Sequence, residues 1–215
     1  VTSEEESPSG SSSAPARSET GPSAASAASE PTGSGASASE IETERAPAHA
    51  VVPSNRKRRA SPYRSLIDRY ARRRDLPRTL LYAIADAESY WDSSAVSHAG
   101  AVGLLQVHPP TGGRLSYSVV HGEPWTPTRE YLTSPENNVR LATKLLELLL
   151  TRYFGDIQHP WTRQLVAVAA YNAGASRVAQ GLTEAGTLDA AVVRANALTP
   201  RQMDERLRRT TPDET

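Results

Sequence analysis

The sequence predicts an all-α domain that follows a disordered N-terminal arm, and three observations favour this fold class. Apolar residues return every three or four positions across residues 61–209, which is the period of an amphipathic helix. The alternating pattern of strands joined by hairpin turns is absent from the sequence. Helix-start signals recur, and most contain a proline: Ser61-Pro62, Pro77, Ser134-Pro135, Thr187 and Thr199-Pro200.

Residues 1–60 are expected to be a disordered low-complexity arm and linker. The first fifty are almost entirely Ser, Ala, Glu, Gly, Pro and Thr, and such a segment cannot bury enough apolar surface to offset its ordering entropy. Residues 61–209 are rich enough in Leu, Val and Ala to form one domain, and residues 210–215 are a C-terminal tail.

The formal net charge is zero, but it is divided unevenly along the chain. Residues 1–50 carry eight Glu against Arg17 and Arg45, so the arm is acidic and the remainder is equally basic. A mildly basic domain suits a negatively charged polymer as partner, although solubility alone explains the division equally well.

Several function classes find little support in the sequence. The chain has no Cys, which excludes disulfides and thiol chemistry, and no apolar run approaches the roughly 18 residues of a membrane span. The basic run at residues 56–59 is interpreted as a solvated linker, with contact to an anionic membrane or polymer as the minority interpretation. It lacks interleaved aromatics, so no nucleic-acid partner is expected.

About seven helices are expected. The first covers residues 63–74 after Ser61-Pro62, with Leu66, Ile67 and Tyr70 on one side, and the second covers residues 78–91. One long loop spans residues 109–133. The longest helix starts at Ser134-Pro135 and runs through Tyr153 to a stop at Gly155. Residues 162–171 are apolar nearly all round, as in a central buried helix, and Thr187 and Thr199 cap two further candidates.

Glu88 is the first candidate for chemistry. Leu81, Ile84, Glu88 and Trp91 follow one another at steps of three and four, which places the carboxyl group on the buried stripe of its helix. A partly desolvated carboxyl group has a raised pKa, so it holds a proton near neutral pH and can act as a general acid. A structural Glu paired with an Arg is the alternative.

The segment after Glu88 contains too many small residues and glycines to form a regular helix. It is expected to fold back over the helix end and bring the Ser97 hydroxyl towards the carboxylate or a ligand amide. Gly100 and Gly103 allow close approach of the backbone to a ligand. Gln106 offers an amide that can bind sugar hydroxyls, although without its neighbours it would be interpreted as an ordinary surface amide.

Three blocks of residues carry a resemblance to a known family. They are Glu88-Ser89 with Trp91, the run from Ala95 to Gln106 that includes Gly100-Ala101-Val102-Gly103-Leu104-Leu105-Gln106, and Ala170-Tyr171-Asn172-Ala173-Gly174. In order and spacing they resemble soluble-lytic-transglycosylase domains, which have a goose-lysozyme-like, all-α fold. The resemblance covers residues 63–209 and extends in particular to the membrane-bound lytic transglycosylases.

The resemblance implies cleavage of the β-1,4 bond between N-acetylmuramic acid and N-acetylglucosamine without water as the nucleophile. Glu88 would act first as acid and then as base, leaving a 1,6-anhydromuramoyl end. Ser97 would polarise Glu88 or hold the acetamido group, and Tyr171 would direct its hydroxyl towards the carboxylate or the scissile sugar. Asn172 would contact substrate or brace the loop. Three residues would line the cleft: Leu104, Leu105 and Gln106.

One position departs from the family pattern. Leu105 stands where the family usually has Met; the swap roughly conserves volume and is expected to alter a substrate contact without abolishing the chemistry. For Tyr171 and Asn172 the alternative roles are a buried aromatic and a helix-terminal amide.

Other carboxylates fit a catalytic pair poorly. Asp86 lies two residues from Glu88 and faces elsewhere on the helix, whereas Asp92 is four residues on and serves more naturally as a loop cap. Glycosidases that use water flank the bond with two carboxylates. A lysozyme-like hydrolase using Asp92, and an inactive glycan-binding module, are therefore the alternatives to a transglycosylase.

No cofactor or metal is expected, because His98, His108, His121 and His159 form no ligand-spaced pair. Four aromatic residues in or near loops either stack on sugars or belong to the core: Tyr117, Trp125, Tyr131 and Trp161. The expected partner is the peptidoglycan glycan strand, in the periplasm or cell envelope. Any membrane association would lie outside this chain, and the oligomeric state is left open.

Overall fold

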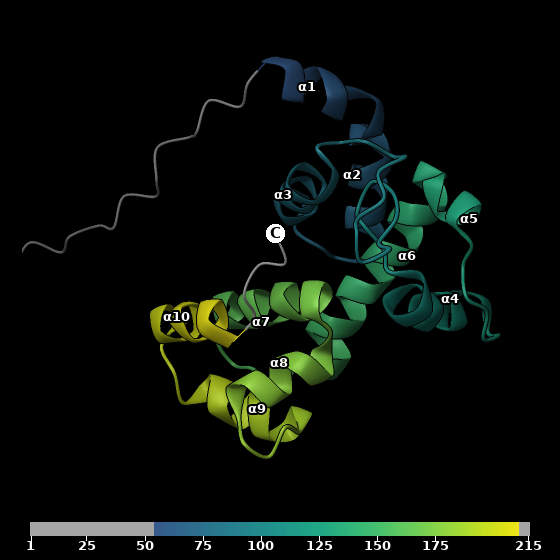
Figure 1. The fold of residues 1–215 in the computed structure, drawn as a ribbon. Coiled ribbons are helices and arrows are strands. Elements are labelled where there is room, and N and C mark those ends of the chain that lie inside the picture. Colours follow the sequence, from purple (N-terminus) through teal and green to yellow (C-terminus); the bar gives the residue numbers. More distant parts are fainter. Residues whose placement is uncertain (1–53, 211–215) are drawn as a thin grey trace, which may run out of the picture. The chain divides into compact units, whose positions relative to one another are not determined.

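The computed structural model describes residues 54–210, which form helices joined by loops (Figure 1). The expectation for residues 1–53 and 211–215 therefore lies outside the described residues. Within the described range the only strand-like pairings are two isolated bridges, Val96 with Val102 and Val102 with Val107. The all-α prediction is confirmed.

The first helices match the predicted order but not every boundary. They are α1 (Ser54–Ala60), a 3-10 turn η1 (Ser61–Tyr63), α2 (Arg64–Arg73) and α3 (Arg78–Ser89). Helix α1 lies in the part of the linker that was expected to be disordered. The Ser61 side chain makes no capping hydrogen bond, because Ser61 is already inside the 3-10 turn.

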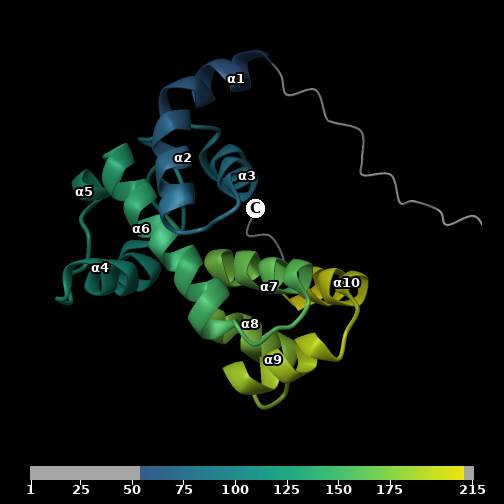
Figure 2. The ribbon, with the colours of Figure 1, turned by 180° about the vertical axis from the view of Figure 1, so that it is seen from behind.

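The predicted loop of residues 109–133 is largely helical, so that prediction is wrong. It contains a π-helical turn η2 (Pro109–Gly113), α4 (Arg114–His121) and α5 (Arg129–Thr133). Helix α4 has no side-chain cap and contains two consecutive Val, which explains its weak local signal. It forms because it packs on α6, which lies beside it in Figure 2.

Helix α6 (Pro135–Leu148) passes directly into a π-helical turn, η3 (Leu149–Tyr153), which together realise the predicted longest helix. Its predicted apolar face is buried as expected: Val139, Leu141, Ala142, Leu145, Leu146, Leu148 and Leu149. Figure 1 shows α6 running from the helices of the N-terminal half to those of the C-terminal half. It therefore contributes to both hydrophobic clusters of the domain.

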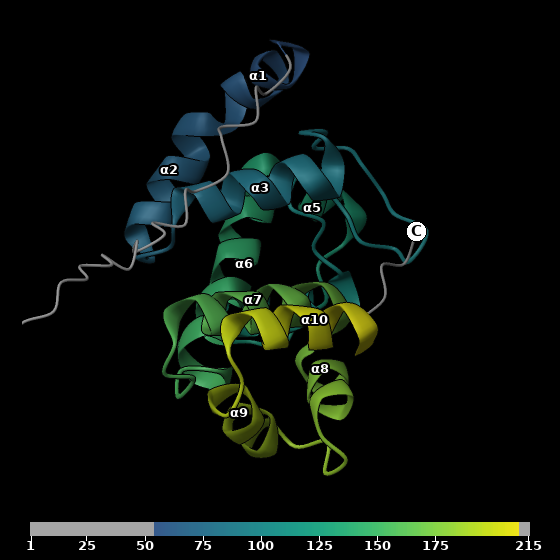
Figure 3. The ribbon, with the colours of Figure 1, turned by 90° about the vertical axis from the view of Figure 1, so that its left-hand side faces the viewer.

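The C-terminal half consists of α7 (Pro160–Ala173), α8 (Ala175–Leu182), α9 (Leu188–Asn196) and α10 (Pro200–Thr210). Figure 3 shows α10 lying along α7, in agreement with their contacts. The side chains of Thr187 and Thr199 accept hydrogen bonds from the amides three residues on, as predicted. Helix α8 was not predicted, because Gly174 was interpreted only as a stop.

Two buried clusters hold these helices together. The first is built by α2, α3, the loop after α3 and the first half of α6, and the second by the end of α6 with α7, α8, α9 and α10. Tyr171 and Leu150 pack against both clusters. Tyr171 thus marks the place where the two halves of the domain meet. No helix within residues 54–210 is long and apolar enough to cross a membrane.

Candidate active site

Glu88 lies in the last turn of α3 and is half-buried. Its neighbours on the inner side of the helix, Ile84 and Ala85, belong to the first hydrophobic cluster. Burial raises the pKa of Glu88 above its usual range, since desolvation disfavours the charged form. The half-buried position of the carboxyl group agrees with its predicted place on the buried stripe of the helix.

The end of α3 differs from the prediction. The helix stops at Ser89, and Tyr90 and Trp91 have positive φ angles of 51° and 66°. Trp91 is therefore not on the helical stripe, although this reversal still returns its side chain to the core, where only 7% of it is exposed. Its indole Nε1 donates to Asp86 Oδ1 at 3.1 Å.

The carboxylates next to Glu88 are both occupied. Asp86 accepts from Trp91 and forms an ion pair with Arg56 at 2.7 Å. Asp92 is exposed and accepts from the Ser94 hydroxyl at 2.7 Å and the Ser94 amide at 2.8 Å. These hydrogen bonds lower the pKa of Asp92, so it is an ionised loop cap. Glu88 is the carboxyl group of this region suited to hold a proton.

The loop between α3 and η2, residues 92–107 and hereafter the glycine loop, is folded back on itself by backbone hydrogen bonds. Gly103 N donates to Ala95 O at 2.8 Å, and Val102 and Val107 bond each other in both directions at 3.0 Å. Gly103 has a φ of 84°, and a Cβ there would lie 2.3 Å from Asn138 Nδ2 and 2.4 Å from Leu132 O. Glycine is required at this position for the loop to reach α6.

Asn138 holds the glycine loop against α6, and its role was not predicted. It is fully buried; its Oδ1 accepts from Leu105 N at 2.8 Å, and its Nδ2 donates to Val102 O at 2.8 Å and to Leu132 O at 3.0 Å. A polar residue placed beside the apolar face of the longest helix was the available signal. A buried amide with three hydrogen bonds fixes the backbone that it contacts.

Leu104 and Leu105 are fully buried in the first hydrophobic cluster, so their side chains do not line an open cleft as was expected. Their backbone carbonyls form the contacts to the site instead. The Ser89 hydroxyl donates to Leu104 O at 2.8 Å, and the Tyr171 hydroxyl donates to Leu105 O at 2.6 Å. The tight turn of the loop directs both side chains inward, into the hydrophobic cluster.

Gln106 is also buried, with 8% exposed, and it is not a surface amide. It has a φ of 47°, and its Nε2 donates to Gly103 O at 2.9 Å and to Ala95 O at 3.1 Å. The amide group therefore braces the glycine loop from inside.

Ser97 lies at the exposed edge of the glycine loop. Its hydroxyl accepts from Ala101 N at 3.0 Å, and the structure gives it no hydrogen bond to Glu88 within residues 54–210. Asn172, near the end of α7, is exposed as well. Both polar groups are accessible to a ligand.

Tyr171 and Glu88 are brought together by the packing of α7 against the N-terminal half. Burial and, to a smaller extent, the nearby charge of Glu88 raise the pKa of the Tyr171 hydroxyl. The phenol therefore stays protonated and donates to Leu105 O. A half-buried carboxyl group that can hold a proton, beside a phenol and an accessible loop, is an arrangement suited to general acid and base catalysis.

The remaining candidates separate into packing and surface residues. Tyr117, Trp125 and Tyr131 contact one another at ring-centroid distances of 4.7 to 5.8 Å. His98, His121 and His159 belong to no group of three or more metal-ligating side chains, and neither does any other described residue. His108 bonds Thr111 Oγ1 and Ala99 O within the loop region. Trp161 is exposed on α7.

Residues 65–193 match the family model described as Transglycosylase SLT domain. The chain is 35% identical over 128 residues to membrane-bound lytic murein transglycosylase C of Sodalis glossinidius (strain morsitans), which covers 60% of this chain and 36% of that protein. The protein of the same name from Edwardsiella ictaluri (strain 93-146) is 36% identical over 60% of this chain and 35% of its own length. The chain thus spans about a third of these relatives.

Two solved structures are similar to part of the chain. An inactive mutant of the lytic transglycosylase Slt from Pseudomonas aeruginosa has a TM-score of 0.46 and 29% identity, over 67% of this chain and 22% of that one. A 70-kDa soluble lytic transglycosylase in complex with bulgecin A has a TM-score of 0.47 and 25% identity, over 73% and 26%.

Proposed function

This chain belongs to the Transglycosylase SLT domain family. We propose that it is a lyase that cuts peptidoglycan glycan strands, with Glu88 as the catalytic acid and base. The bond cut is the β-1,4 linkage from N-acetylmuramic acid to N-acetylglucosamine. The observation that carries the proposal is the raised pKa of a half-buried Glu88 beside Tyr171. The Asp86 carboxylate is engaged by Arg56 and Trp91, and that of Asp92 by Ser94, so neither carboxylate is placed to share the reaction with Glu88.

The reaction needs one carboxyl group that acts twice. Protonated Glu88 gives its proton to the glycosidic oxygen as the bond from that oxygen to C1 of the muramoyl residue breaks. The resulting carboxylate then accepts the proton of the C6 hydroxyl while O6 bonds to C1. The products are a free N-acetylglucosamine end and a 1,6-anhydromuramoyl end, no water is consumed, and Glu88 is protonated again.

The other predicted residues would support this chemistry in two ways. Ser97 and Asn172 are accessible and would bind the substrate's acetamido and hydroxyl groups. Tyr171 would hold the glycine loop in place beside the Glu88 carboxylate through its hydrogen bond to Leu105 O. The backbone of the same loop would shape the cleft at Leu104, Leu105 and Gln106. The proposed reaction requires no cofactor, metal or nucleic acid. The substrate implies the periplasm or cell envelope as location.

The test is the mass of the products released from purified sacculi. Anhydro ends are about 18 mass units lighter than hydrolysed ends, since no water is added. We expect only the lighter species from the native chain, and almost no product from Glu88→Gln in the same digestion time. Reducing ends would identify a lysozyme-type hydrolase and redirect attention to Asp92, whereas absence of products from the native chain would favour a glycan-binding module.

The pH dependence of kcat/KM should follow Glu88. The acid step needs the protonated carboxyl group, so kcat/KM is expected to be highest below the raised pKa of Glu88 and to fall as the pH rises through it. Initial rates of turbidity loss of sacculi from pH 4 to 9 measure this profile. A rate that stays constant through this range would contradict the role of Glu88 as acid.

A further inference from the structure

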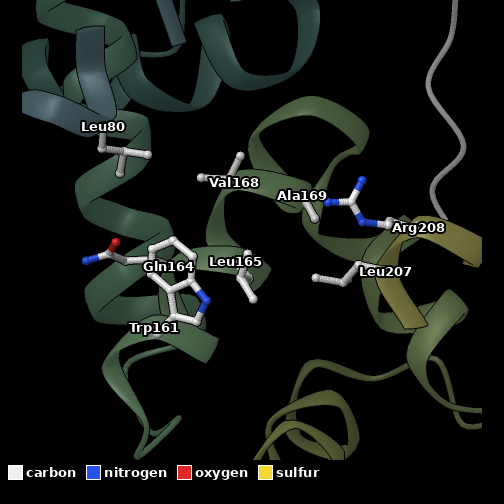
Figure 4. Close-up of a pocket in the computed structure, with 8 residues that line it drawn as sticks. All are labelled: Leu80, Trp161, Gln164, Leu165, Val168, Ala169, Leu207 and Arg208. Carbon is white, nitrogen blue, oxygen red and sulfur yellow. The ribbon is translucent and has the colours of Figure 1, made fainter. Parts of the chain in front are cut away.

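A hollow whose lining does not include Glu88 lies between α3, α7 and α10 and has a volume of about 360 Å³ (Figure 4). It is lined by Leu80, Trp161, Gln164, Leu165, Val168, Ala169, Leu207 and Arg208. Most of these side chains are apolar, and polar groups stand at the rim. The residues 162–171 were expected to be a central buried helix, but this face of α7 is only partly buried.

Trp161 differs from the other two tryptophans of the chain. Trp91 is 7% exposed and packs against Tyr82, and Trp125 is 37% exposed and packs against Tyr117 and Tyr131. Trp161 is 57% exposed, and no other ring or guanidinium stacks on it in the described part of the chain. An exposed, unstacked indole next to a hollow is a typical ligand contact.

The hollow and the Glu88 region share one face of α7. Trp161, Gln164, Val168 and Tyr171 follow at steps of three, four and three, so they lie along one side of the helix. At 1.5 Å per residue, Trp161 is about 15 Å from Tyr171 along the axis. Leu80 lies eight residues before Glu88 on α3 and lines the same hollow. The hollow and the Tyr171 end of α7 therefore lie on the same side of this helix.

The chemistry of the hollow fits a sugar ring bearing an amide. An indole face covers the apolar C–H face of a pyranose. The Gln164 amide, which has no hydrogen-bond partner within residues 54–210, can both donate to and accept from an acetamido group or a hydroxyl. The Arg208 guanidinium also lines the hollow, but it is engaged by Asp204, with Nε donating to Oδ2 at 3.0 Å, so the fit to a sugar depends on Trp161 and Gln164.

We propose that the hollow of α3, α7 and α10 is a saccharide subsite that holds an N-acetylated sugar of the glycan strand away from the bond that is cut. The inference rests on the proposed function for the identity of the strand. Trp161 is the stacking platform and Gln164 orients the ring. The subsite binds long strands and is not reached by short ones.

Binding can be measured apart from catalysis in the full chain carrying Glu88→Gln. The probes are the hexamer and the dimer of β-1,4-linked N-acetylglucosamine, followed by isothermal titration and by the indole N–H signals of the three tryptophans. We expect Trp161→Ala to weaken hexamer binding about tenfold and to leave dimer binding unchanged. Trp161→Phe should retain most of the affinity, whereas Trp161→Leu should not.

Val193→Ala is the matched control, because Val193 is 70% exposed on α9 and lies outside the hollow. The Trp161 indole signal, identified by its loss in Trp161→Phe, should shift with the hexamer and remain in place with the dimer. Equal affinity for the hexamer with Trp161 and with Trp161→Ala would overturn the subsite. So would equal affinity of Trp161→Leu and Trp161→Phe, because an apolar contact such as a peptide would then suffice.

Strand cutting separates this inference from the proposed reaction. If the native chain cuts glycan strands and Trp161→Ala has the same KM for long and short strands, the reaction stands and the subsite is wrong. If strands remain intact while hexamer binding depends on Trp161, the subsite stands and the reaction is wrong.

Discussion

Glu88→Gln is expected to lower kcat for glycan cleavage by about 10³- to 10⁴-fold, because the amide can neither give a proton to the glycosidic oxygen nor accept one from the C6 hydroxyl. Gln has nearly the same shape as Glu and is neutral, as Glu88 is when it holds its proton. Substrate binding should therefore change little. Release of soluble fragments from sacculi under kcat conditions measures the loss.

Asp92→Asn is the matched control, since it removes a carboxylate four residues away that only caps the loop through Ser94. It should retain most of the activity. If Asp92→Asn is as impaired as Glu88→Gln, the single-carboxyl mechanism is wrong and a pair of carboxylates operates.

The stability of Glu88→Gln adds a second readout that separates chemistry from folding. Burial raises the pKa of Glu88 in the folded state, so the folded chain binds the proton more tightly than the unfolded one. The free energy of unfolding is then highest below the unfolded pKa and falls as the pH rises through the folded pKa. Glu88→Gln cannot ionise, so it does not lose unfolding free energy as the pH rises. It should be at least as stable as the native chain at pH 7.

The sequence predicted the burial of Glu88 because a helical stripe depends on local spacing. The steps of three and four residues through Leu81 and Ile84 are enough to place the carboxyl group against the core. The position of Trp91 was wrong because the left-handed conformations of Tyr90 and Trp91 follow from tertiary packing and not from their residue types. A helix end is therefore harder to predict than a helix face.

The inward orientation of side chains in the glycine loop could not be predicted from the sequence, for a different reason. Leu104, Leu105 and Gln106 were expected at the cleft surface, but contact with Asn138, more than thirty residues later, turns them into the core. Such a long-range hydrogen bond has no local signature. The same holds for α4 and α8, which depend on packing against α6 and α7.

The glycine loop is held at two points by two different helices. Asn138 of α6 binds its backbone from one side, and Tyr171 of α7 binds Leu105 O from the other. Because Tyr171 also packs against both hydrophobic clusters, the geometry around Glu88 depends on the contact between the two halves of the domain. The fold thus couples the rigidity of the loop to the environment of the carboxyl group.

Gly103→Ala is expected to lower the free energy of unfolding by about 4 kcal/mol and to abolish most of the activity. The added Cβ would lie 2.3 Å from Asn138 Nδ2 and 2.4 Å from Leu132 O, and neither atom belongs to a flexible surface group. The loop must move away, which breaks the hydrogen bonds of Asn138 to Leu105 and Val102 and leaves buried polar groups unpaired. Urea unfolding and sacculus turnover measure the two effects.

Gly100→Ala is a closely matched control, because Gly100 has the same φ of 84° in the same loop but a Cβ there meets nothing within 4 Å. It carries only the strain of a left-handed alanine, about 1 kcal/mol. The difference between the two variants therefore isolates the contact with Asn138 from the backbone conformation. Equal losses of stability would mean that the left-handed φ, and not the close approach of Gly103 to α6, is what requires glycine in this loop.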